Sequence, residues 1–310
     1  MENKLRQWLF VAVLGVALPG ILLNILPQKQ IPEQQPETKL EETSTEETIR
    51  LLMPDGSVSE LALESYVTCV VLAEMPADFE IEALKAQAVL ARTYALKRHK
   101  EMDKHAGAVC TEASCCQGYC PVSAYQGDIL SLEKVRNAVA ATQGQVLTYG
   151  GELIEATYFS CSGGWTEDAS AVWGADVPYL QATESPGEEQ CKHYTSTTVL
   201  DQQACLRKLG LSAHKLTISD IRYTDGGGVE TVSLCGQSFT GVELRQLLGL
   251  KSTAFRMNVV GDSVIITAKG YGHRVGMSQY GADAMAVGGS NYEQILAHYY
   301  KGTVLTEDFR

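Results

Sequence analysis

The sequence has little positive charge. Its 310 residues include 25 Lys and Arg against 37 Asp and Glu, which gives a formal net charge of −12 at pH 7. A general nucleic-acid binder needs a basic face to neutralise phosphates, so we do not expect nucleic acid as a partner. The composition is otherwise that of a globular protein, and the length allows one large domain or two small ones.

The N-terminal region lacks a convincing small-x-small signal-peptidase site before Pro27. It has instead an uncharged apolar run over residues 8–26, preceded by Lys4 and Arg6. A helix of about 20 apolar residues crosses a bilayer, and positive charge before it stays in the cytoplasm. We therefore predict that residues 1–28 form a cytoplasmic stub and a single transmembrane anchor. A cleaved signal peptide is the alternative, because the run is short and contains a glycine and a proline. Both interpretations place the rest of the chain outside the cytoplasm.

Apolar side chains are scarce in residues 29–48, which are rich in proline, glutamine, glutamate and threonine. Such a segment cannot bury enough apolar surface to offset the entropy of ordering it, so we predict a disordered acidic tether. For residues 49–310 the patterns predict an α+β fold. It would contain a helical core, β-hairpins and a mixed second lobe at about residues 186–260, which together form a substrate cleft.

Two helical patterns meet at Glu74, which is followed by Met75 and Pro76. The first helix should stop near Glu74, because Pro76 has no N–H to donate and disfavours a helical residue before it. The end of a helix carries partial negative charge, and the preceding residues are apolar. Both effects should raise the pKa of Glu74, which suits a group that donates a proton near neutral pH. A solvated glutamate at the end of a surface helix is the plainer interpretation.

The residues around this break resemble a known family. Residues 74–76 read Glu-Met-Pro, and residues 84–95 read Leu-Lys-Ala-Gln-Ala-Val-Leu-Ala-Arg-Thr-Tyr-Ala. This pattern resembles the signature of the stage II sporulation protein D family, membrane-anchored lytic transglycosylases of endospore-forming bacteria. The resemblance runs from about Ile49 to the C-terminus. It implies that Glu74 is the catalytic acid/base and that Arg92 is also required.

A second motif is glycine-rich. Residues 162–166 read Ser-Gly-Gly-Trp-Thr, in which paired glycines let the backbone approach a ligand and hydroxyls can hold sugar oxygens. A plain glycine-rich turn is the alternative. The family has a Ser-Gly-Gly-x-Thr motif that lines the glycan cleft, so the resemblance implies substrate binding by Ser162, Gly163, Gly164 and Thr166.

A third motif follows a predicted strand and spans residues 270–282, which read GYGHRVGMSQYGA. The family has Gly-His-Gly-Val-Gly-Met-Ser-Gln-Tyr-Gly-Ala at this place, closing the active-site cleft. The resemblance implies that His273 and Gln279 bind substrate. Here Arg274 stands where the family has glycine, which removes backbone freedom from the loop.

Cysteines gather between His105 and Cys120. A histidine and three cysteines there, His105, Cys110, Cys115 and Cys116, could form a tetrahedral zinc site. Disulfides are the competing interpretation, because a location outside the cytoplasm permits them. Some relatives bind a metal here with a Cys-x5-Cys pair, which Cys110 and Cys116 match, plus histidines. Cys115 stands where such relatives have histidine, and His105 is one residue out of register. The nine cysteines are an odd number, so at least one is not in an internal disulfide.

The resemblance also implies a reaction with one carboxyl group. A general acid would protonate the MurNAc–GlcNAc oxygen, and the 6-hydroxyl of the same MurNAc would close onto the anomeric carbon, giving a 1,6-anhydro end. No second acid stands out as a partner, which fits this scheme rather than ordinary glycoside hydrolysis. The implied substrate is peptidoglycan stripped of stem peptides, and no organic cofactor is implied. The implied setting is engulfment, with the domain in the intermembrane space around the forespore. The implied partners are a sporulation amidase or endopeptidase and a multi-spanning sporulation membrane protein.

Two rival functions stay open at this point. One is a non-catalytic wall-binding protein, such as an amidase enhancer of the related group, which shares much of the same domain. The other is a cysteine hydrolase that uses Cys161 and His273, both of which lie beside small residues. No third group that would orient the histidine of such a pair is evident.

Overall fold

The computed structural model describes residues 47–102, 104–307 and 309. Within these residues no helix is both long enough and apolar enough to cross a membrane. The predicted anchor at residues 8–26, and all but the last two residues of the predicted tether, lie outside the described part. Eight α-helices and several small sheets make up what is described, which confirms the α+β class.

The described chain begins with a β-hairpin. Strands β1 (Thr48–Leu52) and β2 (Val58–Ala62) pair antiparallel, and β3 (Val109–Cys110) adds to β1 in parallel. Helix α1 (Leu63–Glu74) follows directly. It ends at Glu74, where Met75 takes an extended backbone before Pro76, as the sequence predicts.

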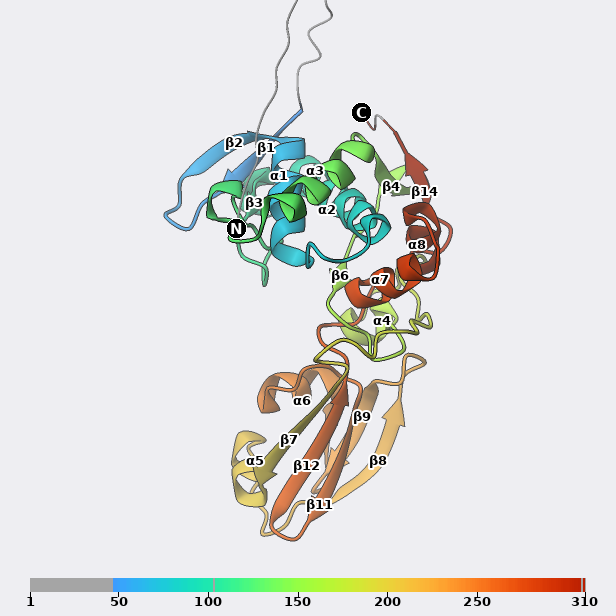
Figure 1. The fold of residues 1–310 in the computed structure, drawn as a ribbon. Coiled ribbons are helices and arrows are strands. Elements are labelled where there is room, and N and C mark those ends of the chain that lie inside the picture. The colour runs from blue at the N-terminus through green and yellow to red at the C-terminus, as the bar shows by residue number, and fades with distance from the viewer. Residues whose placement is uncertain (1–46, 103, 308, 310) are drawn as a thin grey trace, which may run out of the picture. The chain divides into compact units, whose positions relative to one another are not determined.

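Helix α2 (Ile81–Glu101) is the centre of the main core. Its small side chains, chiefly alanines, are completely buried and let other helices approach closely. Helices α1, α3 (Ile129–Ala141), α7 (Gln279–Val287) and α8 (Tyr292–Tyr299) all contact α2 (Figure 1). The C-terminal helices α7 and α8 therefore pack against the N-terminal helix α2.

Short strands join the middle of the chain to its end. Strand β4 (Val146–Tyr149) pairs with β5 (Glu152–Leu153) and with β14 (Val304–Thr306). Strand β6 (Tyr158–Phe159) pairs in parallel with β13 (Met277–Ser278). The patterns predict a single strand over residues 153–159, but β5 and β6 are separate because each pairs with a different partner.

A second hydrophobic cluster lies between residues 205 and 268. It is enclosed by two sheets, β7 (Thr195–Asp201) with β12 (Ser263–Lys269) and β11 (Phe255–Val260), and β8 (Ile218–Tyr223) with β9 (Val229–Leu234) and β10 (Gln237–Thr240). Helices α5 (Gln202–Lys208) and α6 (Gly241–Leu248) pack on these sheets (Figure 1). Helix α6 starts with a capping box between Thr240 and Glu243, which satisfies two free N–H groups.

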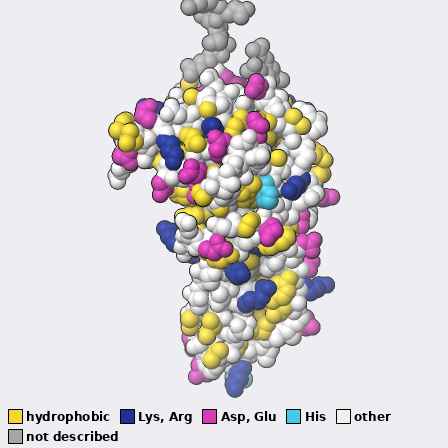
Figure 2. Space-filling view, turned by 45° about the vertical axis from the view of Figure 1, so that its right-hand side comes forward, with side chains coloured by type: hydrophobic (Ala, Val, Ile, Leu, Met, Phe, Trp, Pro, Cys, Tyr) yellow, Lys and Arg dark blue, Asp and Glu magenta, His cyan; other side chains and the backbone are white. Residues whose placement is uncertain are grey.

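Charged side chains of both signs are interspersed on the face of the molecule shown in Figure 2. The remaining short elements are α4 (Ala169–Trp173) and two 3-10 turns, His105–Gly107 and Val122–Ala124. The first of these turns carries His105 and Ala106, two of the six non-glycine residues with positive φ in the described part of the chain. Such backbone conformations are held by their surroundings and often lie at functional sites.

Candidate active site

Glu74 lines a cavity of about 580 Å³. The carboxyl group stands at the C-terminal end of α1, where the last carbonyls of the helix carry partial negative charge. The cavity walls come from the loop after β3, from β6 and the residues beside it, and from the loop before α7. Residues far apart in the sequence therefore surround one acid.

Burial is the largest influence on Glu74 and raises the pKa of its carboxyl group. The backbone N–H of Gly118, which donates to Oε1, opposes this and lowers the pKa, as does the nearby hydroxyl of Tyr158. A side chain at position 118 would crowd the carboxyl, since an added Cβ would lie 3.0 Å from Oε1. Glu74 is thus held in place and favoured in its protonated form.

Gln117 ties the groups around Glu74 together. Its side-chain oxygen accepts a hydrogen bond from the Tyr158 hydroxyl at 2.9 Å, and its Nε2 donates to the Tyr66 hydroxyl at 3.1 Å. Gln117 is 2% exposed, so these bonds are shielded from water. Sequence reasoning did not find Tyr158 or Gly118, because nothing in a short strand or a cysteine-rich loop marks them as neighbours of Glu74.

Two of the predicted substrate-binding residues, His273 and Gln279, line the same cavity as Glu74. The Nδ1 atom of His273 accepts a hydrogen bond from the Val275 N–H at 3.1 Å. Burial, and next the positive charge of Arg245, lower the pKa of His273 to about 4, so the ring is neutral near pH 7. His273 can therefore offer hydrogen bonds to a sugar without bringing a charge.

Arg92 is completely buried and does not line the cavity. Its Nε and Nη2 atoms donate to the two carboxylate oxygens of Glu64 at 2.8 and 2.6 Å, and Nη1 donates to the carbonyl of Gln145 at 3.0 Å. This bidentate pair fastens α1 to α2. The catalytic requirement for Arg92 that the resemblance implies stays a prediction, and the buried position argues against direct contact with a substrate.

The Ser-Gly-Gly-Trp-Thr segment does not line the Glu74 cavity either, although Ser160 just before it does. Ser162 is completely buried, and its hydroxyl donates to Glu188 Oε1 at 2.8 Å. The N–H groups of Ser162 and Gly163 both donate to Glu188 Oε2. Gly164 is half-buried at the turn of this segment, where φ is 115°.

The side chain of Thr166 is buried and exchanges hydrogen bonds with the backbone of Thr183. Gly163 lines a second cavity of about 320 Å³ together with Trp165, which is 46% exposed. Gly163 has no room for a side chain, because an added Cβ would lie 2.7 Å from the backbone N of Gly270. The motif therefore has an internal structural role here, and the predicted sugar contacts stay predictions.

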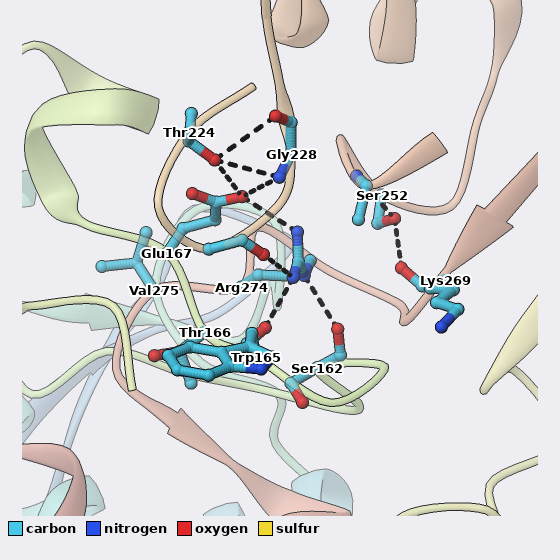
Figure 3. Close-up of polar contacts among 12 residues, drawn as sticks. Ser162, Trp165, Thr166, Glu167, Thr224, Gly228, Ser252, Lys269, Arg274 and Val275 are labelled. Carbon is cyan, nitrogen blue, oxygen red and sulfur yellow. Dashed lines mark hydrogen bonds and ion pairs between the residues drawn. The ribbon is translucent and has the colours of Figure 1, made fainter. Parts of the chain in front are cut away.

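Arg274 holds this segment from the other side (Figure 3). Its guanidinium donates to the carbonyls of Ser162, Trp165 and Gly226 and pairs with Glu167 Oε1 at 2.9 Å. The residue has φ of 67°, so it keeps the left-handed backbone that glycine adopts freely. The four contacts compensate for the strain that replacing glycine brings.

The four predicted metal ligands come together. The imidazole of His105 and the sulfurs of Cys110, Cys115 and Cys116 all lie within 4.8 Å of one another. His105 Nε2 lies 3.4 Å from the sulfur of Cys115, and each of the nine cysteines is a free thiol in the structure. Cys116 also lines the Glu74 cavity and directly precedes Gln117 and Gly118. This cluster could hold a metal ion next to the residues that orient Glu74.

Cys161 does not have the surroundings of a nucleophile. It is completely buried, its thiol donates to Glu188 Oε2 at 3.2 Å, and burial raises its pKa. A catalytic cysteine needs a lowered pKa and access to the substrate. His273 faces the Glu74 cavity, which Cys161 does not line.

Comparisons with known proteins agree with the motifs. A family model described as stage II sporulation protein matches residues 55–149. The chain is 38% identical over 261 residues to stage II sporulation protein D of Bacillus amyloliquefaciens, covering 81% of this chain and 76% of that protein. Stage II sporulation protein D of Bacillus subtilis is 36% identical with the same coverage. The amidase enhancer of Bacillus subtilis is 31% identical over 291 residues, covering 75% of this chain and 39% of that protein. The chain therefore belongs to the stage II sporulation protein D family.

Proposed function

We propose that this chain is a lytic transglycosylase that cleaves the MurNAc–GlcNAc bond of peptide-stripped peptidoglycan during sporulation. One observation carries the proposal. Glu74 is the one carboxyl group that lines its cavity within the described residues, and burial favours its protonated form. Hydrolysis with an external water normally takes two carboxyl groups, whereas a single acid/base suffices when the 6-hydroxyl of the muramic acid attacks.

The proposed steps assign both proton transfers to Glu74. Glu74 gives its proton to the glycosidic oxygen as the bond to the anomeric carbon of MurNAc breaks. The resulting carboxylate takes the proton of the 6-hydroxyl, whose oxygen bonds to the anomeric carbon, so Glu74 ends protonated again. The Gly118 N–H hydrogen-bonds the carboxylate in the interval. The neutral His273 and Gln279 line the space that the saccharide would occupy.

Product analysis tests the proposal. Peptide-stripped glycan strands incubated with the purified full-length chain in detergent should yield 1,6-anhydro-MurNAc ends, detected by mass spectrometry. The runner-up is a non-catalytic protein like the amidase enhancer, and the similarity to that relative is consistent with it. Strands that stay intact while an added amidase works faster would favour the runner-up.

We also propose that the chain acts from the membrane, with its N-terminus in the cytoplasm and its catalytic domain outside. The named partners would be an amidase or endopeptidase that supplies stripped strands and a multi-spanning membrane protein. These proposals rest on the family and on the apolar run at residues 8–26.

Zinc is the metal that we propose for the cysteine cluster. Three thiolates and one imidazole suit Zn²⁺, and a tetrahedral site with bonds near 2.3 Å places sulfur ligands about 3.8 Å apart. The observed separations of at most 4.8 Å are compatible with that spacing. With all four positions taken by protein, the ion would be structural. His105, Cys110, Cys115 and Cys116 would hold it, fixing the loop that carries Gln117 and Gly118.

Metal analysis is expected to find about one zinc ion per chain in protein purified under reducing conditions. Chelation should lower the melting temperature by about 5–10 °C, because a structural ion stabilises only the folded state. Cys110→Ser should lose the zinc. Cys120→Ser, a cysteine of the same loop outside the cluster, should keep it. Metal-free protein with disulfides among these cysteines would contradict the proposal.

The pH dependence of stability is expected to report on Glu74. Burial raises the pKa of this carboxyl above its unfolded value, so the folded chain binds the proton more tightly. The stability contributed in this way is present below the unfolded pKa and is lost as pH rises through the folded pKa. Glu74→Gln, which cannot ionise, should therefore stabilise the protein at about pH 8 and have little effect near pH 4. Urea unfolding at both pH values measures this, and equal effects at the two would count against a raised pKa.

A further inference from the structure

Arg245 is a half-buried arginine without an acidic partner. It comes from α6, and its side chain lines the Glu74 cavity. No carboxylate of the described residues lies within 4.0 Å of its guanidinium. Burial lowers its pKa, which is the effect of removing a cation from water without supplying a counter-charge. A guanidinium has five N–H donors, and partly buried ones are normally paired.

The rest of the cavity does not neutralise this charge. Glu74 is the one acid that lines it among the described residues, and burial favours the neutral form of that acid. His273 is neutral near pH 7. The cavity is therefore positively charged at Arg245, although the whole chain carries a net charge of −12.

A second cation stands at the edge of the same cavity. Tyr271 lines the cavity and is 38% exposed, and the ammonium of Lys251 lies 4.9 Å from the centre of its ring. The carbonyl of Lys251 accepts a hydrogen bond from the Gly272 N–H at 3.1 Å, which ties the residues before β11 to the His273 loop. Arg245 and Lys251 thus both come from the part of the chain that forms the second hydrophobic cluster. Arg245 and the ring of Tyr271 thus line the cavity, and Lys251 adds a second positive charge beside that ring.

We infer that Arg245 binds a carboxylate of the saccharide in the Glu74 cavity, and that this carboxylate is the 3-O-lactyl group of MurNAc in peptide-stripped strands. The inference rests on the proposed function for the identity of the saccharide. A free lactyl group is an anion that a guanidinium can bind with two hydrogen bonds. In a peptide-bearing strand the same carbonyl is an uncharged amide. Arg245 therefore selects stripped strands over strands that keep their peptides.

Chemical modification of the substrate tests this without any variant. The wild-type chain should cleave stripped strands whose lactyl carboxylates have been converted to amides with a kcat/KM lower by about 10- to 100-fold. This factor corresponds to the loss of a charge-assisted hydrogen bond. Arg245→Gln should lose a similar factor on native stripped strands and should no longer distinguish them from amidated ones. Arg245→Lys should recover part of the loss. Arg222→Gln, an exposed arginine of β8 in the same lobe, is the matched control and should behave as wild type.

A binding measurement distinguishes an error in this inference from an error in the proposed function. Full-length Glu74→Gln should bind native stripped strands more tightly than amidated strands or peptide-bearing strands. This result is expected whether or not the wild-type chain cleaves the strands. Tight binding of peptide-bearing strands would instead indicate a peptide carboxylate as the ligand and would overturn the lactyl assignment. Equal binding of native and amidated strands, or an Arg245→Gln chain that still discriminates between them, would overturn the anion site itself.

Discussion

Glu74→Gln is expected to lower kcat for 1,6-anhydro-MurNAc formation by about 10²- to 10⁴-fold, the usual contribution of a general acid/base. The amide is close to the carboxyl in shape, and its oxygen can still accept the Gly118 N–H. KM should therefore change little, because the variant keeps the shape of the cavity and loses only the proton donor. Product release from stripped strands, followed by mass spectrometry, measures the effect.

The control for this variant is Glu60→Gln, which removes the same charge from an exposed position on β2. It should leave kcat unchanged. An undiminished product yield from Glu74→Gln, with Glu60→Gln also active, would falsify the role of Glu74. Activity of the wild type that needs added external nucleophile would point to a reaction other than intramolecular closure.

Arg274→Met is expected to destabilise the folded chain by about 3–5 kcal/mol, which is typical when one partner of a buried ion pair is removed. Arg274 and Glu167 have side chains only 2% and 1% exposed, so the substitution leaves a buried acid without its counter-charge. It also removes the donor that satisfies the carbonyls of Ser162, Trp165 and Gly226 (Figure 3). Urea unfolding measures the loss.

Two further variants separate the sources of this effect. Arg274→Gly loses the same guanidinium but relaxes a left-handed backbone with φ of 67°, so it should be about 1 kcal/mol less damaging than Arg274→Met. Arg274→Met combined with Glu167→Leu should also cost less than Arg274→Met alone, because no unpaired charge stays buried. Arg136→Met, which breaks an exposed pair with Glu133, should change stability by less than about 1 kcal/mol. A loss of stability as small as this for Arg274→Met would contradict the structural importance of the Arg274–Glu167 pair.

Arg274 shows how a departure from a family motif can be accommodated. The glycine that the family has at this position permits a left-handed turn, and an arginine would normally disfavour it. In the structure the turn is kept, and the longer side chain becomes the centre of a hydrogen-bonded network between the 162–167 segment and the 224–228 turn. Backbone strain is offset by contacts that glycine could not make.

Features that depend on neighbouring residues could be read from the sequence alone. Pro76 ends α1 at Glu74 because proline cannot continue a helix, and the preceding apolar run predicts the poor solvation that raises the pKa. The predicted metal ligands lie within twelve residues, from His105 to Cys116, so a short loop can bring them together. The helical core and the hairpin of β8 and β9 follow from their own periodicity and turn residues.

Features that depend on long-range contacts were decided by the tertiary structure. The sequence shows Arg92 only as part of a motif, and packing places it against Glu64, away from the cavity. The hydroxyl of Ser162 points to Glu188, and Tyr158 and Arg245 reach the Glu74 cavity from separate parts of the chain. Which side chains meet an acid depends on how β6 pairs with β13 and how α6 packs beside the His273 loop. The first of these pairings joins residues more than a hundred positions apart, and no local spacing records either of them.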